Sequence, residues 1–295
     1  MTTNPDALAF YAAHGPTSRL PQGTKADDIP EDLAAMRAAV QGLLVHRDWV
    51  KAYGLTDADV RLDEQNIRTI DGLLTRASEL SREPLGVARP PAARVQGICR
   101  HFALLHVAFL RAHAMPARMR CGFAGYFDGS EKWYDHWITE RWDGDRWVRD
   151  DPQVDAVERK IAGIDFDVND QPAGKFLSAN EAWALTRAGE LDPQNFGIFD
   201  MWGAGFIAGN VVSDFACMNR MEMLPWDFWS PLTEGGPWRD VGATAPMIDE
   251  LAALMATDDF DAIRSRYRDD GRLRVPANIM TMVDGEAVPA VVEVD

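Results

Sequence analysis

Three short stretches decide the fold: GICRHFA at Gly97–Ala103, YDHWITE at Tyr134–Glu140 and WVRDDP at Trp147–Pro152. They present a cysteine, a histidine and a carboxylate in that order. The first stretch opens an apolar segment, whereas the other two have the composition of strands. The sequence therefore predicts three chemically distinct side chains on three different pieces of local structure.

The cysteine lies at the start of a predicted helix. From Cys99 to His113 the chain has no proline or glycine and is apolar nearly all round, which predicts a buried helix. Gly97 precedes this helix and Pro116 follows it, so Cys99 falls in the first turn. The helix dipole and the first N–H groups favour a thiolate there. The same N–H groups can hold the oxyanion of a tetrahedral intermediate.

The histidine and the carboxylate lie on either side of a predicted hairpin. The dipeptide Asp143-Gly144 predicts the turn between two strands. If the turn consists of these two residues alone, His136 lies opposite Asp151, with Cβ atoms about 4.5–5.5 Å apart. Side chains alternate along a strand, so we prefer Asp151 over Asp150 as the partner of the histidine. A longer loop would shift this register.

The motifs resemble the core of the transglutaminase-like superfamily, over about residues 90–155. The resemblance is carried by Gly-x-Cys-Arg-x-x-Ala, Asp-His-Trp and Trp-Val-x-x-Asp-Pro. That family shares the papain-like Cys–His–Asp arrangement. The resemblance implies that Cys99 is the nucleophile, His136 the general base and acid, and Asp151 the group that orients the histidine. It implies an α+β fold with a central helix packed on an antiparallel sheet and helical additions at both ends.

One position departs from the family pattern. Eukaryotic transglutaminases place an oxyanion-holding tryptophan before the cysteine, but no tryptophan lies between Trp49 and Cys99. Gln96, three residues before the cysteine, could donate instead, as an upstream glutamine does in papain-like proteases. We therefore name Gln96 as the candidate oxyanion donor.

Candidate substrate-binding residues lie mainly after the core. Ile207–Leu224 is predicted to be a helix with polar residues among apolar ones, including Asn210 and Asp214, and Trp226 follows it. Buried polar side chains need partners, so this helix is either a satisfied polar network or one wall of the acyl-donor or amine pocket. Trp137, next to the histidine, is a further candidate because the segment is rich in aromatic residues.

The chain is predicted to divide into four parts of one globular unit. Residues 1–29 are expected to be loosely ordered, 30–90 to be N-terminal helices, 91–155 to be the catalytic core and 156–295 to be a mainly helical extension. Within them we expect helices from about Pro30 to Tyr53, from about Asp63 to Leu80, and from Ala245 to Tyr267, with a hairpin near the end.

Composition excludes several classes of protein. A net charge of −16 opposes binding to nucleic acid. Three cysteines and the absence of a signal-like or membrane-spanning segment indicate a cytoplasmic protein that does not act at a membrane. The other two, Cys121 and Cys217, are interpreted as buried and inert. The helix histidines His101, His106 and His113 are interpreted as packed or exposed side chains, because no metal-ligand spacing or cofactor motif is present.

These residues predict cysteine-dependent acyl transfer through a thioester acyl-enzyme. The acyl donor would be a small-molecule or peptide amide or thioester, and the acceptor would be water or an amine. Amide hydrolysis and transamidation both stay open, since they differ only in which acceptor reaches the thioester. The alternative is a non-catalytic binding or interaction protein that keeps the same fold.

Overall fold

The computed structural model describes residues 4–229 and 241–294. The described residues form two compact units. Unit 1 consists of the described part of Met1–Met119 together with Trp137–Pro172. Unit 2 consists of Arg120–His136 and the described part of Ala173–Asp295. The chain therefore passes between the units more than once, unlike the four consecutive parts that the sequence predicts.

The largest sheet has six strands in the order β6-β3-β4-β7-β8, with β5 paired to β4. Two of its strands, β3 and β4, each contain residues of both units. The pairs β3–β6, β4–β5 and β7–β8 are antiparallel, and the pair β4–β7 is parallel. The strands are β3 (Ala117–Ala124), β4 (Trp133–Trp142), β5 (Trp147–Asp150), β6 (Phe176–Ser178), β7 (Phe196–Ile198) and β8 (Met201–Trp202).

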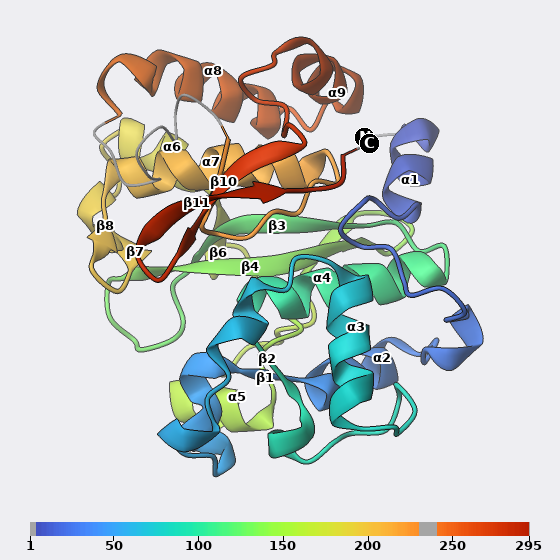
Figure 1. The fold of residues 1–295 in the computed structure, drawn as a ribbon. Coiled ribbons are helices and arrows are strands. Elements are labelled where there is room, and N and C mark those ends of the chain that lie inside the picture. The colour runs from blue at the N-terminus through green and yellow to red at the C-terminus, as the bar shows by residue number, and fades with distance from the viewer. Residues whose placement is uncertain (1–3, 230–240, 295) are drawn as a thin grey trace. The chain divides into compact units, whose positions relative to one another are not determined.

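Unit 1 is built around the predicted central helix. This helix, α4, spans Cys99–Ala112, and every side chain from Cys99 to Arg111 is buried. It contacts the helices α1, α2 and α3 and the two-stranded parallel sheet of β1 and β2 (Figure 1). The remaining helix of this unit is α5. The bounds are α1 (Pro5–Ala12), α2 (Leu33–Leu43), α3 (Ile70–Leu80), α5 (Ala156–Ala162), β1 (Leu44–His46) and β2 (Val95–Gly97).

The expectation that residues 1–29 are loosely ordered is wrong for the described residues. Asn4 caps α1 by accepting the backbone N–H of Asp6. The buried Arg111 of α4 donates to the backbone oxygen of Tyr11 at 3.2 Å and to Oγ of Ser18 at 2.9 Å. A buried guanidinium must find acceptors, and this segment supplies them, which fixes it to the central helix.

The two predicted N-terminal helices are shorter than the apolar spacing indicated. The first, α2, ends at Leu43, where the chain enters β1 and pairs with β2. The second, α3, begins only at Ile70, after a cap by Thr69 and a preceding 3₁₀ turn at Leu62–Asn66. Sheet pairing and capping thus override local helical periodicity at both places.

Unit 2 packs three helices together: α6, α7 and α8 contact one another (Figure 1). The predicted hairpin near the end is confirmed, since β10 and β11 pair around a turn at Asp284-Gly285. The predicted helix over Ala245–Tyr267 is two helices, because Asp259 caps a new one. The bounds are α6 (Ala179–Arg187), α7 (Ala204–Met218), α8 (Ala245–Ala256), α9 (Phe260–Asp269), β9 (Asp227–Phe228), β10 (Asn278–Val283) and β11 (Glu286–Val291).

The α+β class is confirmed, and with it the central helix. Side chains of β4 and α4 meet within unit 1, where Oγ1 of Thr139 donates to the backbone oxygen of Ala103 at 3.3 Å. None of the helices in residues 4–229 and 241–294 is both long and apolar enough to cross a membrane.

A buried ion pair joins β3 to α7 inside unit 2. Nε and Nη2 of Arg120 donate to the carboxylate of Asp214 at 2.9 and 2.7 Å. The backbone N–H of Cys121 donates to the same carboxylate at 2.9 Å. Asp214 is fully buried and Arg120 nearly so, which means that each charge depends on the other for its solvation.

We predict that Asp214→Ala lowers the free energy of unfolding by about 3–5 kcal/mol, because it leaves a buried guanidinium without its counter-ion. Asp57→Ala is the matched control, since it removes an exposed pair with Lys51 and should cost about 0–1 kcal/mol. Urea unfolding followed by tryptophan fluorescence measures both values. Equal losses in the two variants would contradict this view of the pair.

Candidate active site

Cys99 is the first residue of α4, as predicted, and its side chain is 7% exposed. The turn before it is tight, because a Cβ at Gly97 would lie 2.8 Å from Cβ of His101. Only glycine avoids that contact without moving the helix. The sequence thus places the thiol at the N-terminus of a helix of fourteen residues, where the dipole favours the thiolate.

His101 closes the first turn of this helix. Its Nδ1 accepts the backbone N–H of Ile98 at 3.2 Å, and its Nε2 lies 2.9 Å from the backbone oxygen of Ile67. Nε2 therefore carries the proton and the ring is neutral. Burial lowers the pKa of His101 to about 3. The interpretation of His101 as a packed, hydrogen-bonded side chain is confirmed.

Arg100 anchors the same turn to the same loop. Its Nη2 donates to the backbone oxygen of Arg68 at 2.6 Å and its Nη1 donates to that of Ile67 at 3.4 Å. The Arg100 side chain is fully buried. Sequence reasoning missed this anchoring role, although a charged residue in an otherwise apolar helix was a signal that could have revealed it.

Gln96 does not fit the role of oxyanion donor. Its Nε2 donates to the backbone oxygen of Asp59 and its Oε1 accepts the backbone N–H of Arg61, both at 2.7 Å. Its backbone N–H donates to the buried Glu64. Gln96 is fully buried in β2, and these bonds direct its amide at residues 59–61. The prediction is corrected: Gln96 ties β2 to a neighbouring loop.

His136 lies in β4 and is 2% exposed. The rings of Tyr126 and Phe127 meet its imidazole edge-on, with centroids at 6.0 and 5.0 Å. The preceding residue, Asp135, accepts a hydrogen bond from Nδ2 of Asn210 at 2.7 Å. Asn210, which was predicted to bind substrate, therefore hydrogen-bonds the side chain of Asp135, the residue directly before His136. All these residues belong to unit 2.

The hairpin register differs from the prediction. Trp142 pairs with Trp147 and Thr139 with Asp150, so the loop runs from Asp143 to Arg146. Pairing ends at Asp150, and Asp151 is not directly opposite His136. The turn is longer because the side chain of Asp143 accepts the N–H groups of Asp145 and Arg146, which stabilises a wider loop.

Asp150 and Asp151 have different surroundings, and both are fully buried. Asp150 accepts Nη2 of Arg37 at 2.5 Å and Nε of Arg141 at 3.3 Å. Burial raises the pKa of Asp150 to about 6, and the two guanidinium groups oppose that rise. Asp150 is thus part of an ion network of unit 1. This engagement supports the preference for Asp151, whose Oδ1 accepts the backbone N–H of Gln153 at 3.0 Å.

A third buried carboxyl, Glu158, lies close to Asp151. Gln153 connects the two, because its Nε2 donates to Glu158 at 2.9 Å. The hydroxyl of Tyr53 donates to the other Glu158 oxygen at 3.4 Å. Burial raises the pKa of Glu158 to about 8, so this carboxyl is mostly protonated at neutral pH. The sequence carried no signal for this group, which lies on the short helix α5.

The other predicted substrate-binding residues are mostly structural. Trp137 is 1% exposed and lies in the core, so its side chain is not accessible to a substrate. Asp214 is committed to Arg120, which confirms the polar-network interpretation of its helix and excludes it from a pocket wall. Trp226 is half-buried beside β9, where its backbone oxygen accepts the N–H of Met282.

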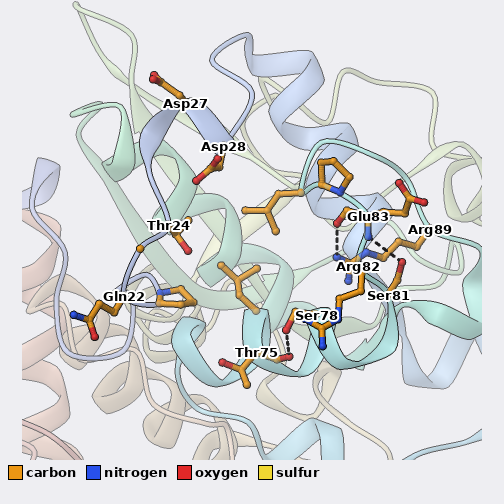
Figure 2. Close-up of a pocket in the computed structure, with 15 residues that line it drawn as sticks. Gln22, Thr24, Asp27, Asp28, Thr75, Ser78, Ser81, Arg82, Glu83 and Arg89 are labelled. Atoms are coloured by element: carbon orange, nitrogen blue, oxygen red, sulfur yellow. Dashed lines mark hydrogen bonds between the residues drawn. The ribbon is translucent and has the colours of Figure 1, made fainter.

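A cavity of about 730 Å³ opens in unit 1 between residues 21–28 and 74–89. Asp27 and Asp28 lie on one side of it, and Arg82 and Arg89 on the other (Figure 2). Its lining contains no cysteine or histidine, so this cavity does not house the predicted chemistry. Across residues 4–229 and 241–294, no cluster of three or more His, Cys, Asp or Glu side chains could hold a metal ion.

The predicted triad is divided between the two units. Cys99 and Asp151 belong to unit 1, whereas His136 is the last residue of its unit 2 segment and is bonded to Trp137 of unit 1. Each of the three side chains is at least nine-tenths buried. Cys99 lies at a helix N-terminus, His136 lies in a strand, and Asp151 directly follows a strand.

Comparison with known proteins adds the family. A family model described as the Transglutaminase-like superfamily matches residues 76–152, a segment that contains Cys99, His136 and Asp151. Residues 76–152 are thus a segment similar to the transglutaminase-like superfamily. The match points to cysteine-based catalysis in general terms. No curated protein matches the chain significantly.

One solved structure is similar over part of its length. It is a protein from Cytophaga hutchinsonii provisionally named as a cysteine protease, with 18% sequence identity. The match covers 45% of this chain and 48% of that one, so it spans less than half of either. With a TM-score of 0.18, this similarity supports no inference about activity.

We predict that the buried cap makes the protein sensitive to acid. The ordinary histidine pKa is about 6.5, so between about pH 6.5 and 3 the unfolded chain binds a proton at His101 that the folded chain does not. Stability therefore falls as the pH drops through this window, by up to about 1.4 kcal/mol per pH unit.

The variant His101→Gln keeps an acceptor and a donor but does not titrate. Its unfolding free energy, measured by urea titration between pH 4 and 6, should have a slope lower by about one proton than that of the wild type. The buried His106, whose pKa burial lowers, and the buried Asp150 and Glu158, whose pKa values burial raises, remain in both proteins and contribute equally to both slopes. Identical slopes would show that His101 titrates normally.

Proposed function

We propose that the protein is a cysteine-dependent acyl-transfer enzyme that cleaves or forms an amide bond. Cys99 is the nucleophile, His136 the general base and acid, and Asp151 the residue that orients the imidazole. The observation that carries the proposal is the position of Cys99 as the first residue of α4, within the segment that matches the family. His136 and Asp151 lie in the same segment.

The first half-reaction forms the acyl-enzyme. His136 takes the proton of the Cys99 thiol, and the sulfur attacks the carbonyl carbon of an amide or thioester donor. The C–S bond forms while the C–N bond, or the donor's own C–S bond, breaks. His136 gives its proton to the leaving amine or thiol. Backbone N–H groups at the start of α4 stabilise the oxyanion, because they lie where the helix dipole is positive.

The second half-reaction releases the acyl group. Water or an amine loses a proton to His136 and attacks the thioester carbon. The C–S bond breaks, the thiol regains its proton, and the product is a carboxylic acid or a new amide. Asp151 keeps the imidazole in one tautomer and supports its positive charge.

The local environment supports these roles. Arg100 and His101 fix the first turn of α4 through bonds to residues 67–68, so the thiol is held on a rigid support. Phe127 and Tyr126 restrain the imidazole plane of His136. Asp150 is committed to Arg37 and Arg141, which favours Asp151 as the orienting carboxylate.

The donor is proposed to be a small-molecule or peptide amide or thioester. Hydrolysis and transamidation share the acyl-enzyme and differ only in the acceptor. The opposing class is a non-catalytic binding protein with the same core, and the two classes differ in the reactivity of Cys99.

We predict that Cys99 forms a covalent acyl adduct. Incubation with S-methyl thioesters and primary amides of acetic, hexanoic and benzoic acid should add one acyl mass to the intact protein for at least one donor. Cys99→Ala should abolish the adduct, because the other two cysteines, Cys121 and Cys217, are fully buried. Cys121→Ala is the matched control and should retain it, since Cys121 is fully buried in β3.

An adduct equally abundant in the Cys99→Ala protein would contradict the proposal. So would a Cys99 that iodoacetamide modifies no faster than Cys217 at neutral pH, because a helix-start thiolate reacts faster than a buried thiol. Either result would favour the binding protein.

We predict that Asp151→Asn slows turnover by about 10²–10⁴-fold while the adduct on Cys99 still forms slowly. The amide cannot support the charge on the imidazolium. Asp155→Asn is the matched control, since asparagine caps α5 as well as aspartate does. Turnover of both variants at wild-type rates would remove Asp151 from the mechanism. Circular dichroism checks that both variants are folded.

A further inference from the structure

An aromatic row crosses the sheet of unit 2 beside the predicted general base. Tyr134 of β4 pairs with Gly197 of β7, and Gly197 pairs with Trp202 of β8. Residues paired in register lie on the same face of a sheet, so the side chains of Tyr134 and Trp202 stand on either side of a glycine. The hairpin of β7 and β8 forms this end of the sheet (Figure 1).

Gly197 is required for the row. A Cβ there would lie 2.0 Å from the backbone oxygen of Met201, so no larger residue fits. With no side chain between them, the rings of Tyr134 and Trp202 meet edge-on, with centroids 5.7 Å apart. Both residues are partly exposed. The Tyr134 hydroxyl donates to Asp128 at 2.5 Å, and Nζ of Lys132 lies 4.8 Å from the centroid of the Trp202 ring, so a ligand would contact the rings beside these two groups.

Phe199, at the tip of the same hairpin, exposes a further aromatic ring at a conformational cost. Its side chain is 69% exposed, and its φ is 53°, in the left-handed region that glycine and asparagine prefer. A bulky residue there is strained, and its exposed ring gains little from folding. The backbone oxygen of Phe199 accepts Nε1 of Trp202 at 2.7 Å, which ties the tip to the row. Strain without burial indicates that the ring serves a ligand.

The position of Tyr134 on β4 indicates which part of the substrate would contact the row. Tyr134 and His136 are two residues apart on one strand, so their side chains share a face about 6.6–6.8 Å apart. A general acid and base transfers its proton at the nitrogen of the leaving or attacking amine. Groups beside the histidine therefore contact the amine side of the reaction rather than the acyl side.

We infer that Tyr134, Trp202 and Phe199 form a subsite for an aromatic or flat apolar group on the amine that leaves or attacks. This inference rests on the proposed function and deepens it by naming a class of amine. The charged groups at the row do not select a cation, because Asp128 accepts the hydroxyl of Tyr134 and Nζ of Lys132 lies 4.8 Å from the centroid of the Trp202 ring. The subsite therefore selects by apolar contact with the ring of the amine.

Phenethylamine and propylamine are suitable probes, since both are primary amines and differ in the ring. The acyl-enzyme is formed on the full-length protein with whichever S-methyl thioester of the trapping panel acylates Cys99 fastest. Its decay is then followed by mass spectrometry with each amine. Phenethylamine should react about tenfold faster than propylamine, the gain expected for one aromatic contact of about 1.4 kcal/mol.

Phe199→Asn and Trp202→Leu should each remove most of that preference. Asparagine suits a positive φ, so the melting temperature of Phe199→Asn should be unchanged or higher, which separates a ligand role from a folding role. Trp49→Leu is the matched control, a half-buried tryptophan of unit 1, and should keep the preference. Acylation of Cys99 by the methyl thioester should be unchanged in Trp49→Leu.

The outcomes distinguish this inference from the proposed function. Acylation without a preference for phenethylamine, or a preference that survives in both row variants, would overturn the subsite and leave the acyl transfer intact. If Cys99 is never acylated, the proposed function fails. The subsite is then decided by binding of phenethylamine to the free protein, followed by tryptophan fluorescence. Saturable binding that is lost in Phe199→Asn supports the subsite, and equal binding in both proteins overturns it.

Discussion

The attachment of the start of α4 to residues 67–68 is the constraint on which the candidate site depends. A helix N-terminus leaves N–H groups without intrahelical partners, and here the His101 imidazole accepts one of them from within the same turn. The other ring nitrogen and the Arg100 guanidinium bind backbone oxygens of a segment more than thirty residues earlier. Local capping and long-range anchoring are therefore performed by two adjacent side chains, and Cys99 precedes both.

This arrangement has an electrostatic consequence. A charged capping residue would add its own field beside the thiol, and a carboxylate there would disfavour the thiolate. A histidine whose pKa burial lowers to about 3 caps the helix as a neutral group. The neutral cap therefore does not oppose the helix dipole at Cys99. The dipole favours ionisation of the sulfur, which is what a nucleophilic role requires.

Much of the fold could be predicted where the hydrophobic pattern, the helix or strand propensity and the turn residues all indicate the same element. The apolar run after Cys99 has one stable solution, a buried helix, and α4 begins and ends within a residue of the prediction. The terminal hairpin was equally clear from Asp284-Gly285. Predictions were wrong where a partner distant in sequence decides the outcome. Residues 5–18 are ordered by Arg111, and β1 ends the helix before it by pairing with β2.

The same distinction applies to the candidate site. Cys99 could be placed on its helix from local sequence, whereas the register of β4 and β5 depended on Asp143, whose side chain favours a wider loop than Asp-Gly alone indicates. The roles of Gln96 and Asp214 could not be predicted from the neighbouring sequence. A polar side chain in an apolar segment gives the same sequence pattern whether it binds a ligand or pairs with another residue of the protein. Only the positions of Asp59, Arg61 and Arg120 decide between these cases.

In the proposed mechanism, hydrolysis and amide formation compete for one thioester, so the environment of the proposed general base would decide between them. Water needs no binding surface, whereas an amine must displace it and be held while it loses a proton. A row of rings that begins at Tyr134, two residues before His136 on β4, would raise the local concentration of an aromatic amine and exclude water from the same space. Phe199 has a left-handed backbone conformation that is unfavourable for a bulky residue, so its ring is present at a cost in folding free energy. An enzyme that selects an aromatic amine gains a binding contact for this cost, whereas an enzyme whose acceptor is water gains none.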